Sequence, residues 1–295
     1  MPRVKTLARM IFDGRGRPLA PVAKPSPAHW KDDAVTGSCL GHSTVLMNFL
    51  GVRIVTDPVF STRVGLGFQP LVLGPKRHLR PALRPREFAP PDLILLSHAH
   101  FDHLDVASLR KFSCDTPIVT ARNTGDLLRR WRFRDIHEIG WGDELTLTIR
   151  GGPLRISALK VAHWGARMIR DAHRGYNGYV LRRHGASVCF AGDTAYTRAF
   201  AQLNNPRRPL DLILMPIGAY NPWIRAHCSP EQAVEMANQA GARYFVPIHH
   251  ETFQLSHEPM DEPAARLRAA LAHEPERLLA VRVGETFQVP MKCAA

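Results

Sequence analysis

The chain has 295 residues, enough to bury one large hydrophobic core or two small ones, and its 45% hydrophobic and 22% charged residues are ordinary for a globular protein. No run of about 18 apolar residues occurs, which excludes a helix that spans a bilayer. The 39 Lys and Arg residues outnumber the 26 Asp and Glu residues and give a formal charge of +13, which favours nucleic acid, anionic lipid or anionic substrates as partners. A genomic preference for arginine codons, with a solvated basic surface, is the alternative.

Residues 1–34 predict an irregular N-terminal arm, because its prolines prevent a long helix. The arm also lacks the continuous apolar segment of a signal peptide. From Val35 on, β-branched and apolar runs on either side of Leu50-Gly51 predict a strand hairpin. Residues 61–91 lack periodicity and are interpreted as a long loop.

This loop carries a dense basic segment, residues 76–86, with Lys76, Arg77, Arg80, Arg84 and Arg86. Because arginine forks suit phosphate, the segment can hold a phosphate or a lipid headgroup. A solvated loop without a ligand is the alternative. A loop of this length beside a suspected site is often functional, so both interpretations stay open.

A buried apolar strand, Leu93–Leu96, ends in Ser97 and is followed by four residue types that bind metals: His98, His100, Asp102 and His103. Alternate side chains of an extended segment point the same way, so the first two histidines can reach one ion as a pair. Asp102 and His103 follow after the chain turns and can face a second ion. Imidazole and carboxylate ligands suit zinc and related first-row metals.

The middle of the chain alternates helices and strands. Periodicity predicts helices over Val106–Phe112 and Asn123–Arg130, the latter capped by Asn123 or Thr124, and strands over Pro117–Thr120, Asp143–Arg150, Leu154–Val161, Gly178–Arg183 and Ser187–Phe190. The basic and aromatic run Arg129–Arg134 has the look of a nucleic-acid patch. A helix end followed by an exposed turn is the preferred interpretation.

The C-terminal third begins with a buried strand over Leu210–Met215 and continues with a helix that has several start signals. Ser229 is typical of an N-cap, Pro230 of the first helical position, and Gln232 closes a capping box. This helix is predicted to end near Ala240, because a glycine follows. The remaining predicted elements are a strand over Tyr244–Ile248, a helix over Pro263–His273 and a closing strand pair near Leu278–Val289.

Alternating strands and helices predict an α/β protein in which polar residues recur where a strand stops. In layered α/β folds, that edge is where sites assemble. Two halves, one on either side of Gly151-Gly152, each have strands followed by helices. We therefore predict a four-layer αββα sandwich with mixed sheets, in which residues 1–34 are the arm and residues 35–295 form a single domain.

Three further candidate metal ligands close separate strands: His163, Asp193 and His249. Taken singly, they are a core histidine, a turn aspartate and a satisfied strand end. Taken together with the His98–His103 segment, they come from the ends of separate strands, as a site for two metals requires.

Two other residues lie at predicted sheet edges, His42 in Gly41–Thr44 and Asp57 before Pro58. Metal-bound imidazoles need a partner for their second ring nitrogen, and Asp57 or His42 can serve. For Asp57, a turn residue before proline is the alternative.

The segment His98-Ala-His100-Phe-Asp102-His103 matches the HxHxDH signature, and with the later His, Gly-Asp-Thr and His motifs the chain resembles the metallo-β-lactamase superfamily. The resemblance implies seven ligands for two metals: His98, His100 and His163 on the first, Asp102, His103 and His249 on the second, and Asp193 bridging them. His250 competes with His249 on the residues alone. The family pattern places the ligand directly after Pro247-Ile248 and so favours His249.

Short motifs narrow the resemblance to the branch that contains N-acyl-phosphatidylethanolamine-hydrolysing phospholipase D: Gly41–Val45, Thr56–Ser61, Gly74–Arg77, His163-Trp164, Ile217–Tyr220 and Ile248-His249. In that branch, a histidine after the Gly-Ala-Tyr motif lies beside the metals and assists catalysis, and His227 matches it. A surface loop histidine is the alternative. Asp102 is the other catalytic candidate. Gly175–Tyr179 departs from the tryptophan-rich segment of that branch, which leaves the lipid specificity open.

The resemblance implies a hydrolase with two divalent metal ions, zinc with iron or manganese as alternatives, and a metal-bridging hydroxide. The expected substrate is a phosphodiester, a phospholipid or another small anionic molecule, with peripheral membrane contact. A lactone or ester is the alternative substrate. A basic nucleic-acid-processing protein is a third interpretation, and the absence of a recognised RNA module weighs against it.

The five cysteines are scattered and form no CxxC pair. This pattern predicts no disulfide framework and a reducing compartment, and therefore a cytoplasmic protein that can touch a membrane from its surface.

Overall fold

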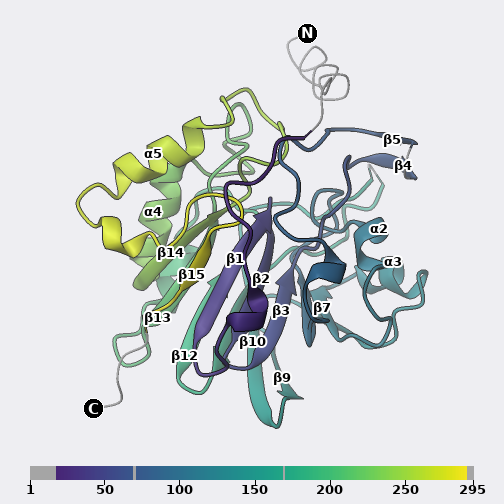
Figure 1. The fold of residues 1–295 in the computed structure, drawn as a ribbon, viewed down its shortest axis with the longest axis horizontal. Helices are drawn as coiled ribbons and strands as arrows, with labels where there is room; N and C mark the ends of the chain where they lie inside the picture. Colours follow the sequence, from purple (N-terminus) through teal and green to yellow (C-terminus); the bar gives the residue numbers. More distant parts are fainter. Residues whose placement is uncertain (1–17, 69–70, 169, 291–295) are drawn as a thin grey trace.

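Two mixed β-sheets lie face to face in the computed structural model, which describes residues 18–68, 71–168 and 170–290 (Figure 1). The first sheet has the order β15 (Thr286–Gln288), β1 (Val35–Gly41), β2 (Thr44–Phe49), β3 (Val52–Thr56), β6 (Leu93–Leu96), β7 (Ile118–Ala121) and β8 (Ile136–Ile139). The second has the order β14 (Ala242–Ile248), β13 (Leu210–Pro216), β12 (Ala186–Phe190), β11 (Gly178–Arg183), β10 (Gly152–Leu159) and β9 (Glu144–Ile149).

Helices cover the outer faces of both sheets. Helices α4 (Pro230–Gln239) and α5 (Glu262–Ala270) pack on the second sheet, and α2 (Val106–Leu109) and α3 (Gly125–Arg129) pack on the first. The main core lies between the sheets and contains residues of both, such as Phe49 and Phe190. The predicted α/β sandwich with four layers is therefore confirmed.

Strand direction decides where a site can form. Strands β3, β6, β7 and β8 are parallel neighbours, and so are β12, β13 and β14. Because parallel strands end on the same side, their carboxyl ends form one edge in each sheet. The edge carries the loops after β3, β6, β12 and β14, which contain Asp57, His98, Asp193 and His249.

Local sequence signals account for the start of α4, but not for every helix end: α2 already ends at Leu109, before the predicted Phe112. Ser229 and Gln232 form the predicted capping box of α4, with Pro230 in the first turn. Thr124, one of the two predicted cap residues, occupies the N-cap position of α3, but its side chain makes no cap hydrogen bond. Instead, the Glu138 carboxylate accepts from the backbone N–H groups of Thr124 and Gly125, each at 2.9 Å.

Three other expectations need correction. The closing strand pair near Leu278–Val289 is only β15, which pairs with β1, while Leu278 makes an isolated bridge to Phe245. Helix α5 ends at Ala270, three residues before the predicted end. The segment 61–91, interpreted as a loop without periodicity, contains a two-stranded ribbon, β4 (Leu66–Phe68) and β5 (Leu71–Leu73). In addition, strand β8 (Ile136–Ile139) was not predicted.

The part of the arm that the structure describes, residues 18–34, is irregular apart from a short 3-10 turn at Pro27–His29. Leu19 joins it to the basic segment through a parallel bridge with Leu79. Residues 1–17 of the arm lie outside the described residues, and its boundary with the domain stays a prediction. The described helices include none with the length and apolar character needed to cross a bilayer. The four cysteines among the described residues, Cys39, Cys114, Cys189 and Cys228, are free thiols.

Candidate metal centre

Imidazoles and carboxylates from separate strand ends meet at the common edge of the two sheets. Within it, atoms of His98, His100 and His163 lie within 4.8 Å of one another; we call these residues the first group. Nε2 of His98 lies 2.8 Å from Nδ1 of His100, and Nε2 of His163 lies 3.3 Å from the same nitrogen. The first group is the set of three histidines that the resemblance assigned to one metal.

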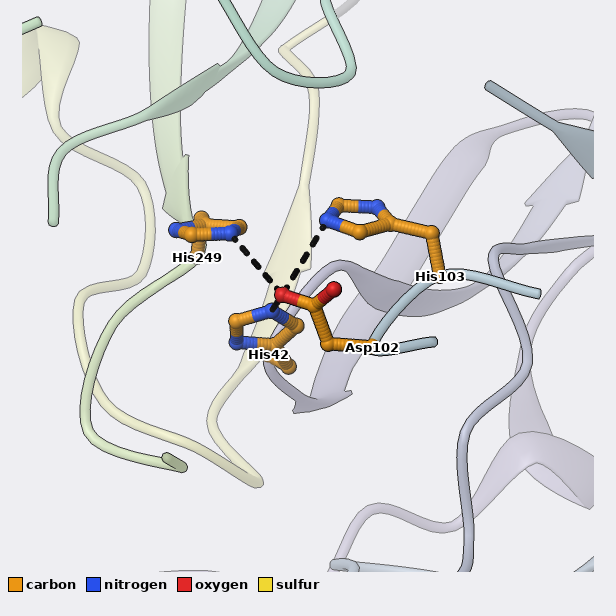
Figure 2. Close-up of side chains that lie close together, drawn as sticks. All are labelled: His42, Asp102, His103 and His249. Carbon is orange, nitrogen blue, oxygen red and sulfur yellow. Dashed lines mark hydrogen bonds and ion pairs between the residues drawn. The ribbon is translucent and has the colours of Figure 1, made fainter. Parts of the chain in front are cut away.

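A second group contains His42, Asp102, His103 and His249, whose side chains gather around the Asp102 carboxylate (Figure 2). Oδ2 of Asp102 lies 3.0 Å from Nε2 of His42, 3.6 Å from Nε2 of His249 and 3.7 Å from Nε2 of His103. His42, expected only as a partner of an imidazole, instead contacts a carboxylate. His250 belongs to neither group.

Asp193 lies between the two groups. Its Oδ2 atom is 3.1 Å from Nε2 of His103 and 3.1 Å from Nε2 of His249, on the side of the second group. The same oxygen is 3.8 Å from Nε2 of His163 and 4.0 Å from Nε2 of His98, on the side of the first group. A single carboxylate oxygen is thus close to nitrogens of both groups, the arrangement that a bridging ligand requires.

Charge and burial protonate two imidazoles of the second group and leave the other rings neutral, His42 included, because burial foremost lowers the pKa of His42 to about 3. Burial and neighbouring imidazoles lower the pKa of His98 well below its ordinary value and that of His100 to about 4, so both are neutral at pH 7. In the second group, burial favours the neutral imidazole, but Asp193 and Asp102 outweigh it. They raise the pKa of His103 well above its ordinary value and that of His249 to about 9.

The carboxylates stay ionised. Burial alone would raise the pKa of Asp102 and of Asp193, but the nearby imidazoles, His103 foremost, hold both pKa values well below the usual range. Two carboxylates, one buried (Asp193) and one partly buried (Asp102), therefore face the centre, and a cation there could take the place of the protons on His103 and His249.

Hydrogen bonds on the outer side of the rings fix which nitrogen faces the centre. Nδ1 of His103 donates to Oδ2 of Asp57 at 2.6 Å, and Nδ1 of His163 donates to the carbonyl oxygen of Ala226 at 2.8 Å. Nδ1 of His98 lies 2.9 Å from Oγ of Ser97, which in turn donates to Asp57 at 2.6 Å. Each bond leaves Nε2 of the ring directed inward, as metal-binding histidines require.

Oδ1 of Asp193 is buried without a hydrogen-bond partner among the described residues, and Nε2 of His103 and Nε2 of His249, also buried, face Oδ2 of Asp193 at 3.1 Å without making a hydrogen bond to it. Buried polar atoms are rarely left unpaired, because desolvation without a partner is costly. A cation supplies the missing partner, and imidazole with carboxylate is a ligand set that zinc, iron and manganese accept. The residues therefore fit a metal centre.

Backbone strain is concentrated at the same place. His42, Asp57 and His249 have φ values of +58°, +33° and +61°, a region that L-residues seldom adopt. The backbone N–H of His249 donates to the carbonyl of His42 at 3.0 Å, so the two strained loops hold each other. Such strain persists where surrounding contacts fix it, commonly at functional sites.

His227 stands at the open side of the centre. Its Nδ1 atom is 3.9 Å from Oδ2 of Asp193, and its ring centre is 5.2 Å from that of His163 and 5.1 Å from that of His249. Burial lowers its pKa well below the ordinary value, so it is neutral at pH 7. It is therefore no surface-loop histidine, which was the alternative.

A pocket of about 270 Å³ opens beside the two groups, with His100 and Asp102 in its wall. Phe101, Trp164 and Leu255 give it an apolar lining. Arg167, which the sequence analysis did not single out, donates from Nη1 to the carbonyls of Ala99 at 2.8 Å and Leu104 at 2.7 Å. Its guanidinium also lies over the Phe101 ring at 3.9 Å, so it braces the loop that carries His98–His103.

Ser97 was also missed as a functional residue, although a polar residue at the end of a buried strand was a usable signal. Tyr176 of the Gly175–Tyr179 segment bridges to His98 and contacts the His163 ring, at 6.5 Å between ring centres. In the basic segment, Arg77 is buried and donates to the carbonyls of Val59 and Leu79, so it serves the fold rather than a ligand.

The basic and aromatic run at Arg129–Arg134 is used structurally. Phe133 is buried, Arg129 pairs with Glu138 at 3.0 Å, and Arg134 pairs with Asp115 at 3.0 Å. A helix end and turn account for this run without a nucleic-acid partner.

Comparisons with known proteins agree with this geometry. A family model described as "Beta-lactamase superfamily domain" matches residues 52–250. An uncharacterised protein of Mycobacterium tuberculosis is 32% identical over 272 residues, which cover 89% of this chain and 71% of that protein. N-acyl-phosphatidylethanolamine-hydrolyzing phospholipase D 1 of Caenorhabditis elegans is 29% identical over 269 residues, 84% of this chain and 74% of that protein.

Among solved structures, a metallo hydrolase of the archaeon Ignicoccus hospitalis has a TM-score of 0.65 and 19% sequence identity. The match covers 88% of this chain and 100% of that chain, so the two proteins share a fold.

Proposed function

The chain belongs to the metallo-β-lactamase superfamily and is a metal-dependent hydrolase, and on that premise we propose that it hydrolyses phosphodiesters as a phospholipase D-like enzyme with two metal ions. The observation that carries the proposal is the position of Asp193, whose Oδ2 lies within 4.0 Å of imidazole nitrogens from both groups. A dinuclear centre needs such a shared carboxylate.

In this proposal, His98, His100 and His163 would hold one ion and Asp102, His103 and His249 the other, and Asp193 would serve both sets. Two bound divalent cations, zinc in the first instance, would activate a water and neutralise charge on the phosphoryl oxygens. Asp57, Ser97 and the Ala226 carbonyl orient the imidazoles of His103, His98 and His163 so that Nε2 of each faces inward.

His227 and Asp102 are the proposed catalytic residues. His227, whose Nδ1 atom lies 3.9 Å from Oδ2 of Asp193, would orient the substrate or protonate the leaving group. Asp102, ionised and held by His42 at 3.0 Å, presents its carboxylate to the same space.

Two features support a phosphodiester as substrate. The relative from Caenorhabditis elegans is by its name a phospholipase D that hydrolyses N-acyl-phosphatidylethanolamine. The formal charge of +13 favours an anionic substrate over a neutral lactone or ester.

The test begins with metal analysis of the purified protein, followed by hydrolysis of a bis-aryl phosphodiester and of a lactone panel. We expect divalent metal in the protein and turnover of the phosphodiester, and we expect His100→Ala and Asp193→Ala to abolish it without unfolding the chain. His137→Ala is the control, because His137 is a histidine of β8 outside both groups. Full activity of either variant, or activity on lactones alone, would refute the proposal.

A further inference from the structure

A large cavity between the arm and the basic segment has a strongly cationic lining. Its volume is about 1100 Å³, and it shares no lining residue with the pocket beside the metal centre. Among the described residues that line it, Glu87 has the only carboxylate, against six cationic side chains: Lys24, Arg77, Arg80, Arg84, Arg86 and Lys111. We call this space the basic cavity.

The arm forms one wall of the basic cavity and is bonded to the opposite wall. The N–H of Leu19 donates to the carbonyl of His78 at 2.8 Å, and the N–H of Arg80 donates to the carbonyl of Leu19 at 2.8 Å. Farther along the arm, Nζ of Lys24 pairs with Oε1 of Glu87 at 2.7 Å. The cavity is therefore a built feature of the fold and not a gap beside an unattached segment.

Most of the exposed cations in the lining have no counterion. The Glu87 carboxylate is already occupied, because Oε1 pairs with Lys24 and Oε2 accepts from the N–H of Arg84 at 2.8 Å. Four exposed side chains form no ion pair and donate no side-chain hydrogen bond within the described part of the chain: Arg80, Arg84, Arg86 and Lys111. Guanidinium forks without a carboxylate partner are donors that suit phosphate oxygens.

A buried positive charge lies behind the same lining. Arg77 is 3% exposed, and its Nη atoms donate to the carbonyls of Leu79 and Val59 at 3.4 and 2.9 Å. Its Nε atom has no hydrogen-bond partner, and its guanidinium makes no ion pair with a described carboxylate. Arg77 therefore serves the fold through its contacts, while its charge stays uncompensated where solvent screens it little. An anion in the basic cavity would offset that charge.

The lining also defines the kind of anion. A single phosphate group meets only one or two of the free cations, so several phosphate groups on one molecule are the better match. A nucleic-acid strand is a poorer match, because Phe60 is the one aromatic residue of the described lining and is only 8% exposed, which leaves no platform for stacked bases. Residues 1–17 do not suit the cavity electrostatically, since they carry five Lys or Arg and one Asp.

We propose that the basic cavity is a second ligand site, apart from the metal centre, and that it binds a small soluble polyphosphate, a molecule with two or more linked phosphate groups. The guanidinium groups of Arg80, Arg84 and Arg86 and the ammonium group of Lys111 hold its oxygens. The basic segment thus serves a ligand rather than being only a solvated loop. The proposal does not depend on the phosphodiesterase function, because it concerns binding and not turnover.

The experiment titrates inorganic triphosphate into the full chain with its metals and follows binding by calorimetry at low and at high salt. The test variant is Arg80→Gln/Arg84→Gln, at two exposed positions of the lining. The matched control is Arg207→Gln/Arg208→Gln, which removes the same charge from two exposed arginines of the loop before β13. Orthophosphate, adenosine triphosphate and hexaglutamate are titrated in the same way.

We expect inorganic triphosphate to bind the wild type and the control equally, and the test variant about tenfold or more weakly, because two guanidinium forks are lost. Orthophosphate should bind more weakly than triphosphate, since it reaches fewer cations, and every affinity should fall as salt is raised. Adenosine triphosphate should bind no more tightly, because the lining offers its base no aromatic face. Turnover of the bis-aryl phosphodiester and the thermal midpoint should be the same in all three proteins.

Phosphates also bind metals, so a further variant separates the two sites. His100→Ala, in which the first group is incomplete, should bind triphosphate as the wild type does. Binding that is lost in His100→Ala but kept by the test variant would place the triphosphate at the metal centre and overturn the proposal.

Three other results would also overturn it. The wild type could fail to bind triphosphate, or the test and control variants could lose affinity equally, which would mean that only the net charge of the chain attracts the anion. Hexaglutamate that binds as tightly as triphosphate would make the cavity a site for an acidic peptide. Adenosine triphosphate that binds far more tightly would mean that a base, and not the phosphate chain, is recognised.

Discussion

The space between the two sheets and the edge where their strands end are both buried, but they are built in opposite ways. Between the sheets, Phe49, Tyr179 and Phe190 pack in an apolar core, and the one polar tip, the Tyr179 hydroxyl, donates to the Leu96 carbonyl at 2.9 Å. At the edge, His98, His103, Asp193 and His249 are buried and Asp102 is partly buried, but some of their inward atoms lack a hydrogen-bond partner.

The difference shows which region serves the fold and which serves a ligand. An apolar interior stabilises the chain through area removed from water. The edge instead keeps charged carboxylates, unpaired ring nitrogens and positive φ values at His42, Asp57 and His249, each of which costs stability. A bound cation would offset these costs. Substitutions between the sheets should therefore change the free energy of unfolding, and substitutions at the edge should change metal affinity.

The largest expected effect on stability is in the core. Phe49 is fully buried in β2, at the hairpin end away from the metal centre. Phe49→Ala should lower the free energy of unfolding by about 3–5 kcal/mol through lost burial and a cavity, with turnover per folded molecule unchanged. Urea unfolding and activity below the transition measure both. Phe49→Leu is the control, and its free energy of unfolding should fall much less. A large loss of turnover in folded Phe49→Ala would show that the core and the metal centre are not independent.

The next effect is at the edge, on metal affinity. Asp57→Asn should weaken metal binding by about 10–100-fold, because Asp57 orients His103 and, through Ser97, His98. Asp92 offers a matched control, since it precedes β6 at the opposite side of the sheet, accepts from the Arg53 N–H and pairs with Arg150. Asp92→Asn should leave metal affinity unchanged. If a metal titration shows the same loss of affinity for both variants, Asp57 has no particular role in orienting the imidazoles.

Metal binding should also release protons, and only from the second group. Without metal, His103 and His249 are protonated at pH 7 because nearby carboxylates raise the pKa of each, that of His249 to about 9. A metal needs the unprotonated Nε2, so binding should release about two protons at pH 7 and fewer as the pH rises through about 9. The neutral His98 and His100 contribute none.

The same pKa shift predicts the pH dependence of the metal-free protein. A raised folded-state pKa for His249 adds stability that is fully present below its ordinary pKa of 6.5 and is lost as the pH rises through about 9. Thermal unfolding of the metal-free protein between about pH 6 and pH 10 measures this loss of stability.

The protons released on metal binding are counted by titration calorimetry of the metal into the protein, in buffers of different ionisation enthalpy. A count of zero at pH 7 would mean that the two groups do not differ in protonation.

The strand ends explain why much of the site was predictable from the sequence. Ligand residues that follow buried strands need only the sheet to be parallel there to come together, and His98, Asp193 and His249 do so. The residues alone left His249 and His250 open, and the family pattern favoured His249; both are buried, and of the two only His249 lies in a candidate metal group. Residue type and spacing do not say which side of the strand end a ring faces.

What the sequence did not reveal depends on contacts that are distant in the chain. Arg167 acts through carbonyls of Ala99 and Leu104, and backbone carbonyls carry no residue signature. The ribbon β4–β5 has strands of only three residues, too short for a period to emerge in a glycine-rich stretch. Strand β15 pairs with β1 from the other end of the chain, so nothing local indicates its partner.

The smallest expected effect is on the outer surface, away from both regions compared here. Glu231 at the start of α4 accepts two hydrogen bonds from Arg266 of α5, at 2.7 and 2.8 Å. Arg266 foremost lowers the pKa of Glu231 from 4.5 to about 2, so the pair stabilises the fold above pH 4.5, and this stabilisation is lost as the pH falls through about 2.

Both side chains are more than a third exposed, so solvent screens the pair and Arg266→Met should cost only about 0.5 kcal/mol at pH 7. The cost should vanish towards pH 2 and shrink in high salt, and metal affinity should not change. Arg134→Met is the control, because the Arg134–Asp115 pair is still more exposed and should have no measurable effect on unfolding. A cost for Arg266→Met that stays constant from pH 7 to pH 2 would mean that the substitution acts through the lost contact of the guanidinium with the Tyr220 ring rather than through the charge pair with Glu231.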